Sequence, residues 1–169
     1  MTKSLLLGAG SEHTKRLALP DDRDWDELVT CDINGDHPVD VVCDLDVVPW
    51  PFRDATFDEV HAYEVLEHLG GQGDWRAFFD QFYEVWRILR RGGLLFATVP
   101  TGSWIWGDPS HIRYIGPETL VFLSQAEYAK QVGRTPMSDF RFYWKGDFKP
   151  IHAQYSSDYT FEFVLRRIP

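Results

Sequence analysis

A glycine turn and two aspartates each follow an apolar run of the chain. The turn Gly8-Ala9-Gly10 ends the first run, Asp32 the second and Asp44 the third. Glycines in such a turn let a ligand approach the backbone, and the free N–H groups beyond it can hold that ligand. A carboxylate at Asp32 could accept hydrogen bonds from both hydroxyls of a ribose, and one at Asp44 could accept from an adenine amino group. Together these features predict a nucleoside-shaped cleft, whereas the turn alone is equally compatible with a structural role.

Two histidines could act as a base beside that cleft. His68 lies just beyond the fourth apolar run, and His111 lies in a long loop over residues 100–116. Near its usual pKa, a histidine can take the proton from a hydroxyl or amine that acts as a nucleophile. The structural alternatives stay open: His68 could hydrogen-bond to the next loop, and His111 could hydrogen-bond to Asp108.

Other residues of the same regions have two interpretations each. Trp104 and Trp106 could stack on a planar or sugar acceptor, or they could pin the loop to the core. Glu67 beside His68 offers atoms that bind metals, but the sequence contains no convincing ligand set, so it predicts no metal site. The two cysteines form no CxxC motif or disulfide framework, which favours a reducing cytoplasm.

The elements that must position these residues alternate between short apolar runs and longer amphipathic ones, as in an α/β protein. Strands are expected at residues 5–7, 28–31, 39–43, 57–63 and 94–99. A helix is expected over 74–91, capped by Asp74 and ended by Gly92-Gly93, and another over 117–133. Pro20 and the acids after it leave room for only a short helix beyond the glycine turn.

The last part of the chain changes character. Residues 140–148 and 159–165 carry alternating aromatic side chains and predict two adjacent strands, which would pair antiparallel. We therefore expect a single domain over residues 1–169, with a doubly wound, Rossmann-like, mostly parallel sheet of about seven strands that ends in an antiparallel pair.

Charge and hydropathy exclude several functions. The 169 residues carry a net charge of −9, which disfavours binding to duplex DNA. Residues 21–60 contain 13 acids and only two arginines, and we interpret most of these acids as solvated loop residues. No apolar segment approaches the length of a membrane span, so we expect a cytoplasmic protein without membrane contact.

Ordered motifs over residues 5 to about 123 resemble those of class I S-adenosylmethionine (SAM)-dependent methyltransferases, in particular the minimal small-molecule branch. Their order and separations make the resemblance more specific than any one motif. The matching segments are Asp44-Leu45, Pro51-Phe52-Arg53-Asp54-Ala55-Thr56-Phe57-Asp58-Glu59-Val60, Val65-Leu66-Glu67-His68-Leu69, Glu84-Val85-Trp86-Arg87-Ile88-Leu89-Arg90-Arg91-Gly92-Gly93, Val99-Pro100 and Asp108-Pro109-Ser110-His111-Ile112-Arg113.

The resemblance implies a seven-stranded fold and SAM as the cofactor. In the family pattern the glycine turn borders the methionine part of SAM, the ribose lies at Asp32, and the adenine lies at Asp44. Glu64 faces the cleft near the sulfonium, and the histidine matching His68 serves as base in some relatives. The cofactor-binding residues implied are Gly8, Ala9, Gly10, Asp32, Ile33, Asp44, Leu45 and Glu64.

These observations favour an enzyme that methylates a small molecule, sugar or similar acceptor at O or N, with homo-oligomers possible. The chain departs from the family at Leu6, where a polar residue is common, and it lacks the helices that precede the first strand in larger members. These departures motivate the alternative of a SAM-binding module that acts as a sensor or partner subunit. A nicotinamide dinucleotide enzyme ranks last, because it does not explain Asp44-Leu45.

Overall fold

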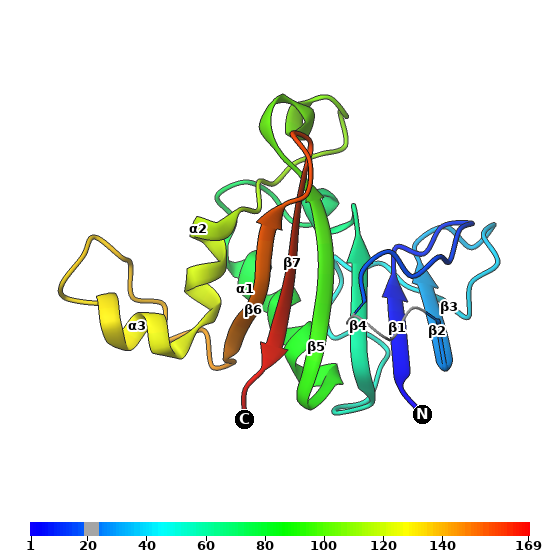
Figure 1. The fold of residues 1–169 in the computed structure, drawn as a ribbon, viewed down its shortest axis with the longest axis horizontal. Helices are drawn as coiled ribbons and strands as arrows, with labels where there is room; N and C mark the ends of the chain where they lie inside the picture. Colours follow the sequence, from blue (N-terminus) through cyan, green and yellow to red (C-terminus); the bar gives the residue numbers. More distant parts are fainter. Residues whose placement is uncertain (19–23) are drawn as a thin grey trace.

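The computed structural model describes residues 1–18 and 24–169, which fold around one seven-stranded sheet (Figure 1). Its strand order is β3-β2-β1-β4-β5-β7-β6. Strands β1 to β5 run parallel, and β7 pairs antiparallel with both β5 and β6. This confirms the expected mostly parallel sheet with an antiparallel end. The strands are β1 (Lys3–Leu7), β2 (Glu27–Asp32), β3 (Val41–Val42), β4 (Phe57–Tyr63), β5 (Leu89–Pro100), β6 (Phe148–Tyr155) and β7 (Thr160–Arg167).

The helices are short except for α1, which lies behind the sheet in Figure 1. It begins after Asp74, whose side chain accepts a hydrogen bond from the Ala77 N–H at 3.1 Å, as expected for an N-cap. Its aromatic stripe is buried in the main core, which confirms a packing role for Phe79 and Phe82. The helices are α1 (Trp75–Ile88), α2 (Pro117–Leu120) and α3 (Gln125–Gln131), with 3₁₀ turns η1 (Leu66–His68), η2 (Gly102–Trp106) and η3 (Val121–Leu123).

Two predicted helix boundaries are wrong. Helix α1 stops at Ile88 because Leu89 is already extended, fully buried and paired with Phe57 of β4. Gly92-Gly93 instead forms an irregularity within β5, where a Cβ on Gly93 would lie 2.9 Å from two backbone oxygens. The predicted helix over 117–133 is interrupted at Ser124, whose hydroxyl caps α3 by accepting from Glu127 N–H.

The predicted strand over 140–148 is also wrong. Its alternating aromatics do not line a sheet but pack on α1: the Phe140 ring lies 5.1 Å from that of Phe79, and Trp144 is buried against the same ring. The antiparallel pair is formed one segment later, by β6 and β7. Alternation of aromatic side chains identified a segment that packs on the core, through Phe140 and Trp144, but not its backbone conformation.

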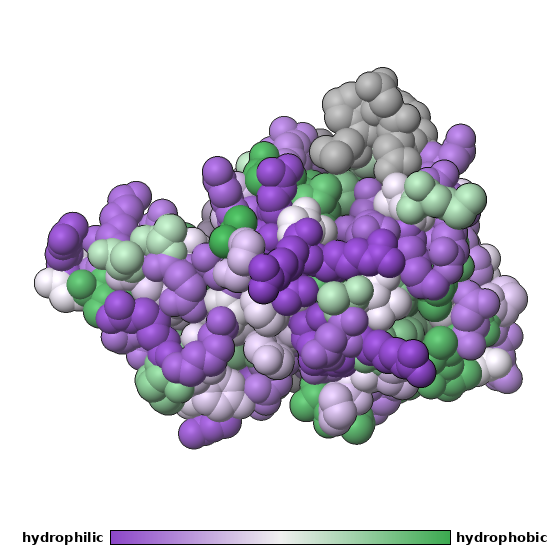
Figure 2. Space-filling view, turned by 90° about the horizontal axis from the view of Figure 1, so that it is seen from below, coloured by the Kyte–Doolittle hydropathy of each residue, from purple (hydrophilic) through white to green (hydrophobic). Residues whose placement is uncertain are grey.

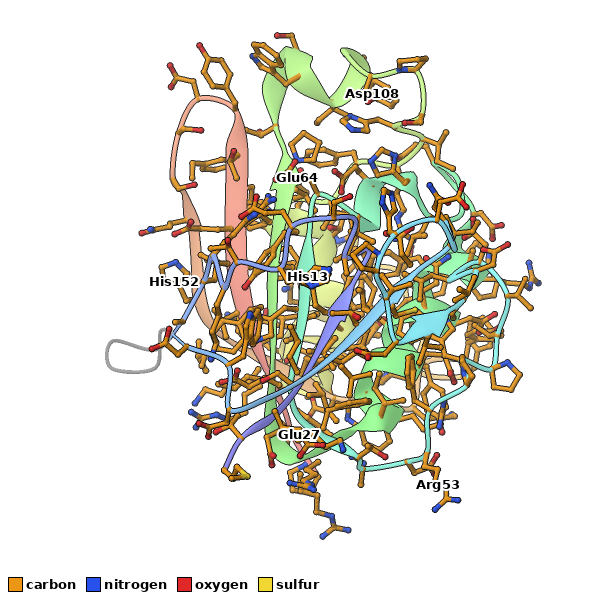
Figure 3. The ribbon with its side chains drawn as sticks, turned by 90° about the vertical axis from the view of Figure 1, so that its right-hand side faces the viewer. His13, Glu27, Arg53, Glu64, Asp108 and His152 are labelled. Carbon is orange, nitrogen blue, oxygen red and sulfur yellow. The ribbon has the colours of Figure 1, made fainter. Side chains whose placement is uncertain are left out.

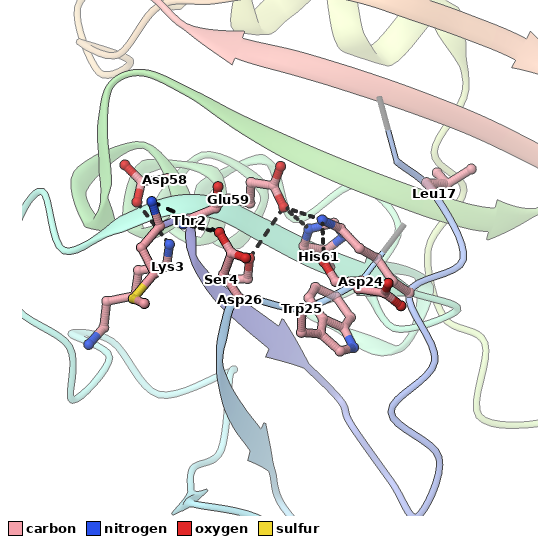
Figure 4. Close-up of polar contacts among 12 residues, drawn as sticks. Thr2, Lys3, Ser4, Leu17, Asp24, Trp25, Asp26, Asp58, Glu59 and His61 are labelled. Atoms are coloured by element: carbon pink, nitrogen blue, oxygen red, sulfur yellow. Dashed lines mark hydrogen bonds and ion pairs between the residues drawn. The ribbon is translucent and has the colours of Figure 1, made fainter. Parts of the chain in front are cut away.

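Residues 11–18 are irregular chain, without a helix in this described segment, and they lie against β4. The short helix expected after the glycine turn is wrong for residues 11–18, while Pro20 lies outside the described residues. This segment is held by a buried polar network around Glu59. The Glu59 carboxylate contacts His61 Nε2 at 3.0 Å and the Ser4 hydroxyl at 3.2 Å (Figure 4). It also contacts Lys15 Nζ at 3.1 Å.

The surface on the side of the two termini is mostly hydrophilic, with hydrophobic residues in small groups (Figure 2). In the described part of the chain, we find no helix of the length and hydrophobicity needed to cross a membrane.

Candidate functional site

The carboxyl ends of β1, β2 and β4 meet at one edge of the sheet, where a cavity of about 300 Å³ opens. The chain leaves β1 toward β2 on one side, and β4 lies on the other, so this edge is the topological switch point where open α/β sheets bind ligands. Figure 3 shows Glu64 at this edge below Asp108, with Glu27 and Arg53 at the opposite end. The lining residues are Gly8, Asp32, Ile33, Cys43, Asp44, Leu45, Asp46, Glu64, Val65, His68 and Leu69.

Seven of the ten predicted site residues line this cavity. Ala9, Gly10 and His111 are not among its lining residues. Gly10 is nevertheless next to it, because its N–H donates a 2.9 Å hydrogen bond to Asp32 Oδ2. The Ala9 N–H donates to the carbonyl of Cys31, so Ala9 ties the glycine turn to the neighbouring strand.

The glycine at position 8 is required by geometry. Gly8 has φ of +58°, and a Cβ there would lie 2.2 Å from Val65 Cγ2. Val65 follows β4, so the glycine lets the end of β1 approach the end of β4 closely. Gly10 also has a positive φ of +55°, but nothing lies within 4 Å of the position of its missing Cβ.

Asp32 is fixed at the cavity wall through both carboxylate oxygens. Oδ2 accepts from Gly10 N–H at 2.9 Å, and Oδ1 accepts from Asn34 N–H at 2.8 Å. Because each carboxylate oxygen has a second lone pair, both remain able to accept from a further donor. Two such oxygens at fixed positions match the paired hydroxyls of a ribose.

Asp44 and Asp46 form the next part of the wall. The Asp46 N–H donates to Asp44 Oδ1 at 2.9 Å, while Asp46 Oδ1 accepts from Gly70 N–H and Gln81 Nε2, both at 2.7 Å. Leu45 between them is buried, whereas Ile33 is 66% exposed at the rim. The cavity therefore offers apolar surfaces beside a carboxylate that can accept from an amino group.

Four lining residues were not predicted as site residues: Cys43, Asp46, Val65 and Leu69. The sequence could have identified Asp46 as a site residue, since it directly follows the Asp44-Leu45 motif. Val65 could not be identified because its role depends on the approach of β1 to β4.

Glu64 adopts a conformation that is rare for a residue with a side chain. Its φ is +56°, while its N–H donates to the Thr98 carbonyl at 2.9 Å. A left-handed backbone at a non-glycine residue costs free energy of order 1–3 kcal/mol and is concentrated at functional sites. This conformation ends β4 and places Glu64 in the cavity lining.

His68, at the end of the cavity, belongs to a cluster with Glu67 and His111. Each histidine Nε2 lies 3.8 Å from Glu67 Oε1, and the two rings are 4.6 Å apart. The Nδ1 atoms contact carbonyl oxygens, His68 that of Ser110 at 3.2 Å and His111 that of Ile105 at 2.9 Å. A carbonyl only accepts, so each Nδ1 carries a proton, which leaves Nε2 as the atom with a lone pair whenever the ring is neutral.

Glu67 is the most deeply buried member of the cluster, with 1% of its surface exposed. Neither of its carboxylate oxygens has a hydrogen-bond partner in another described residue. Burial, followed by smaller effects of the nearby Glu64 and Asp108 charges, raises the pKa of Glu67 to about 8. Glu67 was not predicted as a site residue, because the sequence does not show that His111 folds back onto η1.

The loop carrying His111 is attached to η1 by Arg113. This buried guanidinium donates to the Leu66 carbonyl at 2.7 Å and to Gln81 Oε1 at 2.7 Å. The N–H groups of Ile112 and Arg113 both donate to the Glu67 carbonyl. The His111 side chain bonds to Ile105 rather than to Asp108, whose carboxylate accepts from Ser110.

Trp104 and Trp106, in η2, do not pin the loop to the core. They are 55% and 63% exposed, and the Trp104 ring packs edge-on against Tyr159 at 4.9 Å. Tyr159 lies between β6 and β7, so the loop and the hairpin meet at the same edge as the cavity (Figure 1).

Known proteins resemble this chain in part of its sequence and in its fold. Residues 17–97 match the family model described as a methyltransferase domain. No curated protein sequence matches the chain.

Several solved structures resemble the fold. A SAM-dependent methyltransferase from Archaeoglobus fulgidus is 16% identical, with a TM-score of 0.59 over 98% of this chain and 86% of that one. The 1,6-didemethyltoxoflavin-N1-methyltransferase of Burkholderia thailandensis, solved with its substrate and S-adenosylhomocysteine, is 14% identical, with a TM-score of 0.61 over 99% and 72%. A putative methyltransferase from Haloferax volcanii, in complex with the Trm112 activator, is 13% identical, with a TM-score of 0.56 over 99% and 83%. At these identities the likeness establishes the fold.

Proposed function

We propose that this chain is a SAM-dependent methyltransferase that acts on a small molecule, sugar or similar acceptor at O or N. The methyltransferase domain matched over residues 17–97 and the fold support the proposal. The observation that carries the proposal is the cavity at the switch point, which Asp32, Asp44 and His68 all line. The Burkholderia thailandensis neighbour, which holds a small-molecule substrate, supports an acceptor of that size.

The cavity fits the polar groups of SAM. Asp32, with two fixed oxygens that can each accept one more hydrogen bond, suits the ribose hydroxyls. Asp44 suits the adenine amino group, and Ile33 and Leu45 offer apolar contacts for the ring. Glu64 and the glycine turn at the ends of β4 and β1 suit the cationic methionine part.

When bound, SAM supplies an electrophilic methyl group on a sulfonium that departs with the bonding electron pair as S-adenosylhomocysteine. The protein must then hold the acceptor in line with that methyl group, which can contribute about 7–11 kcal/mol in favourable cases. We assign the removal of the acceptor's proton to His68, which lines the cavity and has the His111 ring beside it at 4.6 Å. The exposed Trp104 and Tyr159 at the same edge offer aromatic surfaces for the acceptor.

The test is transfer of a labelled methyl group from SAM to a panel of hydroxyl- and amine-bearing small molecules and sugars. We expect transfer to at least one class, and His68→Gln should lower it by about 100- to 10,000-fold while binding of S-adenosylhomocysteine is retained. His152→Gln, on the hairpin outside the cavity, is the matched control and should leave the rate unchanged. Cofactor binding with no transfer to any member would instead favour the non-catalytic SAM-binding module.

A further inference from the structure

The cluster of Glu67, His68 and His111 brings three potential metal ligands to one point. One ligand atom from each, a ring nitrogen of each histidine and a carboxylate oxygen of Glu67, all lie within 4.8 Å of one another, and each Nε2 is 3.8 Å from Glu67 Oε1. In a tetrahedral zinc site with bonds of about 2.0–2.2 Å, neighbouring ligand atoms lie roughly 3.4 Å apart. Small rotations of the side chains therefore suffice to close the cluster around an ion.

Both histidines are oriented as metal ligands usually are. Each Nδ1 donates to a backbone carbonyl, of Ser110 for His68 and of Ile105 for His111, and each Nε2 lies 3.8 Å from Glu67 Oε1. Metal-binding histidines almost always donate their other ring N–H to a carbonyl or carboxylate, which fixes tautomer and ring orientation. Contacts between the loop and η1 hold this arrangement. The N–H groups of Ile112 and Arg113 donate to the Glu67 carbonyl, and the Arg113 guanidinium donates to the Leu66 carbonyl.

Glu67 provides an independent observation. Only 1% of its surface is exposed, and both of its carboxylate oxygens lack a hydrogen-bond partner in any other described residue. A buried carboxylate without a partner is costly, and native structures rarely leave one without a ligand or a role. The nearby charges include Glu64 and Asp108 as well as Arg113, so acidic groups predominate around the cluster.

We propose that Glu67, His68 and His111 bind a divalent transition-metal ion, with Zn²⁺ as the best match. Two imidazoles and one carboxylate with further positions open form a ligand set known for Zn²⁺ and for other first-row divalent ions. The proposal replaces the expectation of no metal site, which was based on spacing in the sequence. His111 is 43 positions from His68, and only the folding of the loop onto η1 makes them neighbours.

The role of the ion rests on the proposed function, whereas its binding does not. His68 belongs both to the ligand cluster and to the lining of the cavity at the switch point, so the ion would lie beside that cavity. There it would act as a Lewis acid on an oxygen or nitrogen of the acceptor and lower the pKa of the acceptor's proton, which then passes to solvent. His68 and His111 are ligands when the ion is bound, and only the metal-free protein has His68 Nε2 free to take that proton.

The experiment is titration of the metal-free full chain with Zn²⁺ in competition with a coloured chelator, and with Co²⁺ followed by its visible absorption. We expect one ion per chain and a Co²⁺ spectrum typical of four- or five-coordinate sites. His111→Asn and Glu67→Gln should each weaken Zn²⁺ binding by more than about 100-fold, since even changes outside the ligand set cost ~10- to 100-fold. His152→Asn is the matched control, because His152 also pairs with a carboxylate, Glu162 at 3.1 Å, but belongs to no three-ligand cluster of the described residues.

Folding of each variant is checked by its thermal unfolding transition, and His68→Asn replaces Glu67→Gln if the latter does not fold. Absence of stoichiometric Zn²⁺ binding, or equal binding by wild type and His111→Asn, would overturn the proposal. S-adenosylhomocysteine binding is measured on the same metal-free protein. Cofactor binding without Zn²⁺ binding refutes the metal site alone, and Zn²⁺ binding without cofactor binding refutes the proposed function alone.

Discussion

At the scale of single residues, Gly8 shows how the cofactor cavity depends on backbone geometry. Its φ of +58° and the 2.2 Å distance from a Cβ to Val65 impose two separate costs on any side chain there. A side chain at Gly10 would carry only the cost of the positive φ, since the space at its Cβ position is open. The two glycines of one turn therefore play different roles.

Replacing Gly8 by Ala should lower the free energy of unfolding by about 3 kcal/mol, from overpacking plus a strained φ. Gly10→Ala should cost only about 1 kcal/mol. Urea denaturation measures both. In the double variant Gly8→Ala/Val65→Ala, the losses should be less than additive by more than about 1 kcal/mol, because the clash is removed. Equal losses for the two glycines would show that Val65 does not set the geometry of the turn.

The sequence was informative about site residues that directly follow a strand. Asp32 and Glu64 lie in the cavity lining because a strand end fixes their position along the chain. It was uninformative about Glu67, since burial and lack of a partner arise only when Arg113 attaches the loop to η1. Residues whose chemistry depends on a contact across distant loops have no signature in local spacing.

At the scale of elements, the extended segment over residues 11–18 takes the place of a covering helix. Lys15 reaches Glu59 in β4, and Leu17 N–H donates to the Tyr63 hydroxyl, so buried polar contacts fasten the segment to the sheet. Burial alone raises the pKa of Glu59, but hydrogen bonds and charge interactions with His61 and Lys15 outweigh it and lower the pKa to about 2. Ionised Glu59 therefore stabilises the folded chain.

This pairing predicts a pH-dependent loss of stability in Glu59→Gln. Because the folded pKa lies below the ordinary value of 4.5, the contribution is fully present above pH 4.5 and is lost as the pH falls toward 2. The variant should lose about 3 kcal/mol of unfolding free energy at pH 7, and that loss should shrink by about 2 kcal/mol at pH 3. Urea denaturation at both pH values measures it. Glu27→Gln, in an exposed pair with Lys3, is the control; a loss independent of pH in Glu59→Gln would refute the ionised pair.

The strands were more predictable than the segments between them. Buried parallel strands such as β4 are continuous apolar runs, and β4 was predicted with its observed bounds, Phe57–Tyr63. Gly92-Gly93 has the residue types of a helix end, but pairing of Leu89 with Phe57 ended the helix earlier. Tertiary pairing decided the boundary where local signals allowed two outcomes.

At the scale of the whole molecule, the reversal of strand order between β1 and β4 places the site. The cavity opens at that reversal, and the loop with His111 and the hairpin of β6 and β7 extend beyond the same edge. The acidic residues of the 21–60 segment differ in role. Asp32, Asp44 and Asp46 line the cavity, Glu59 is buried in the polar network, and Asp36 is exposed outside the lining.

The measurement that tests the central claim most directly is calorimetric binding of S-adenosylhomocysteine to the wild type and to Asp32→Ala, Asp44→Ala and Asp36→Ala. We expect binding by the wild type, with a gain of about 2.7 kcal/mol in stability at a ligand concentration 100 times the Kd. Asp32→Ala and Asp44→Ala should each raise the Kd by about 10- to 100-fold, as expected for the loss of a charge-assisted hydrogen bond, and Asp36→Ala should leave it unchanged. A wild-type chain that does not bind the ligand at millimolar concentration, or equal affinities in all three variants, would contradict the account.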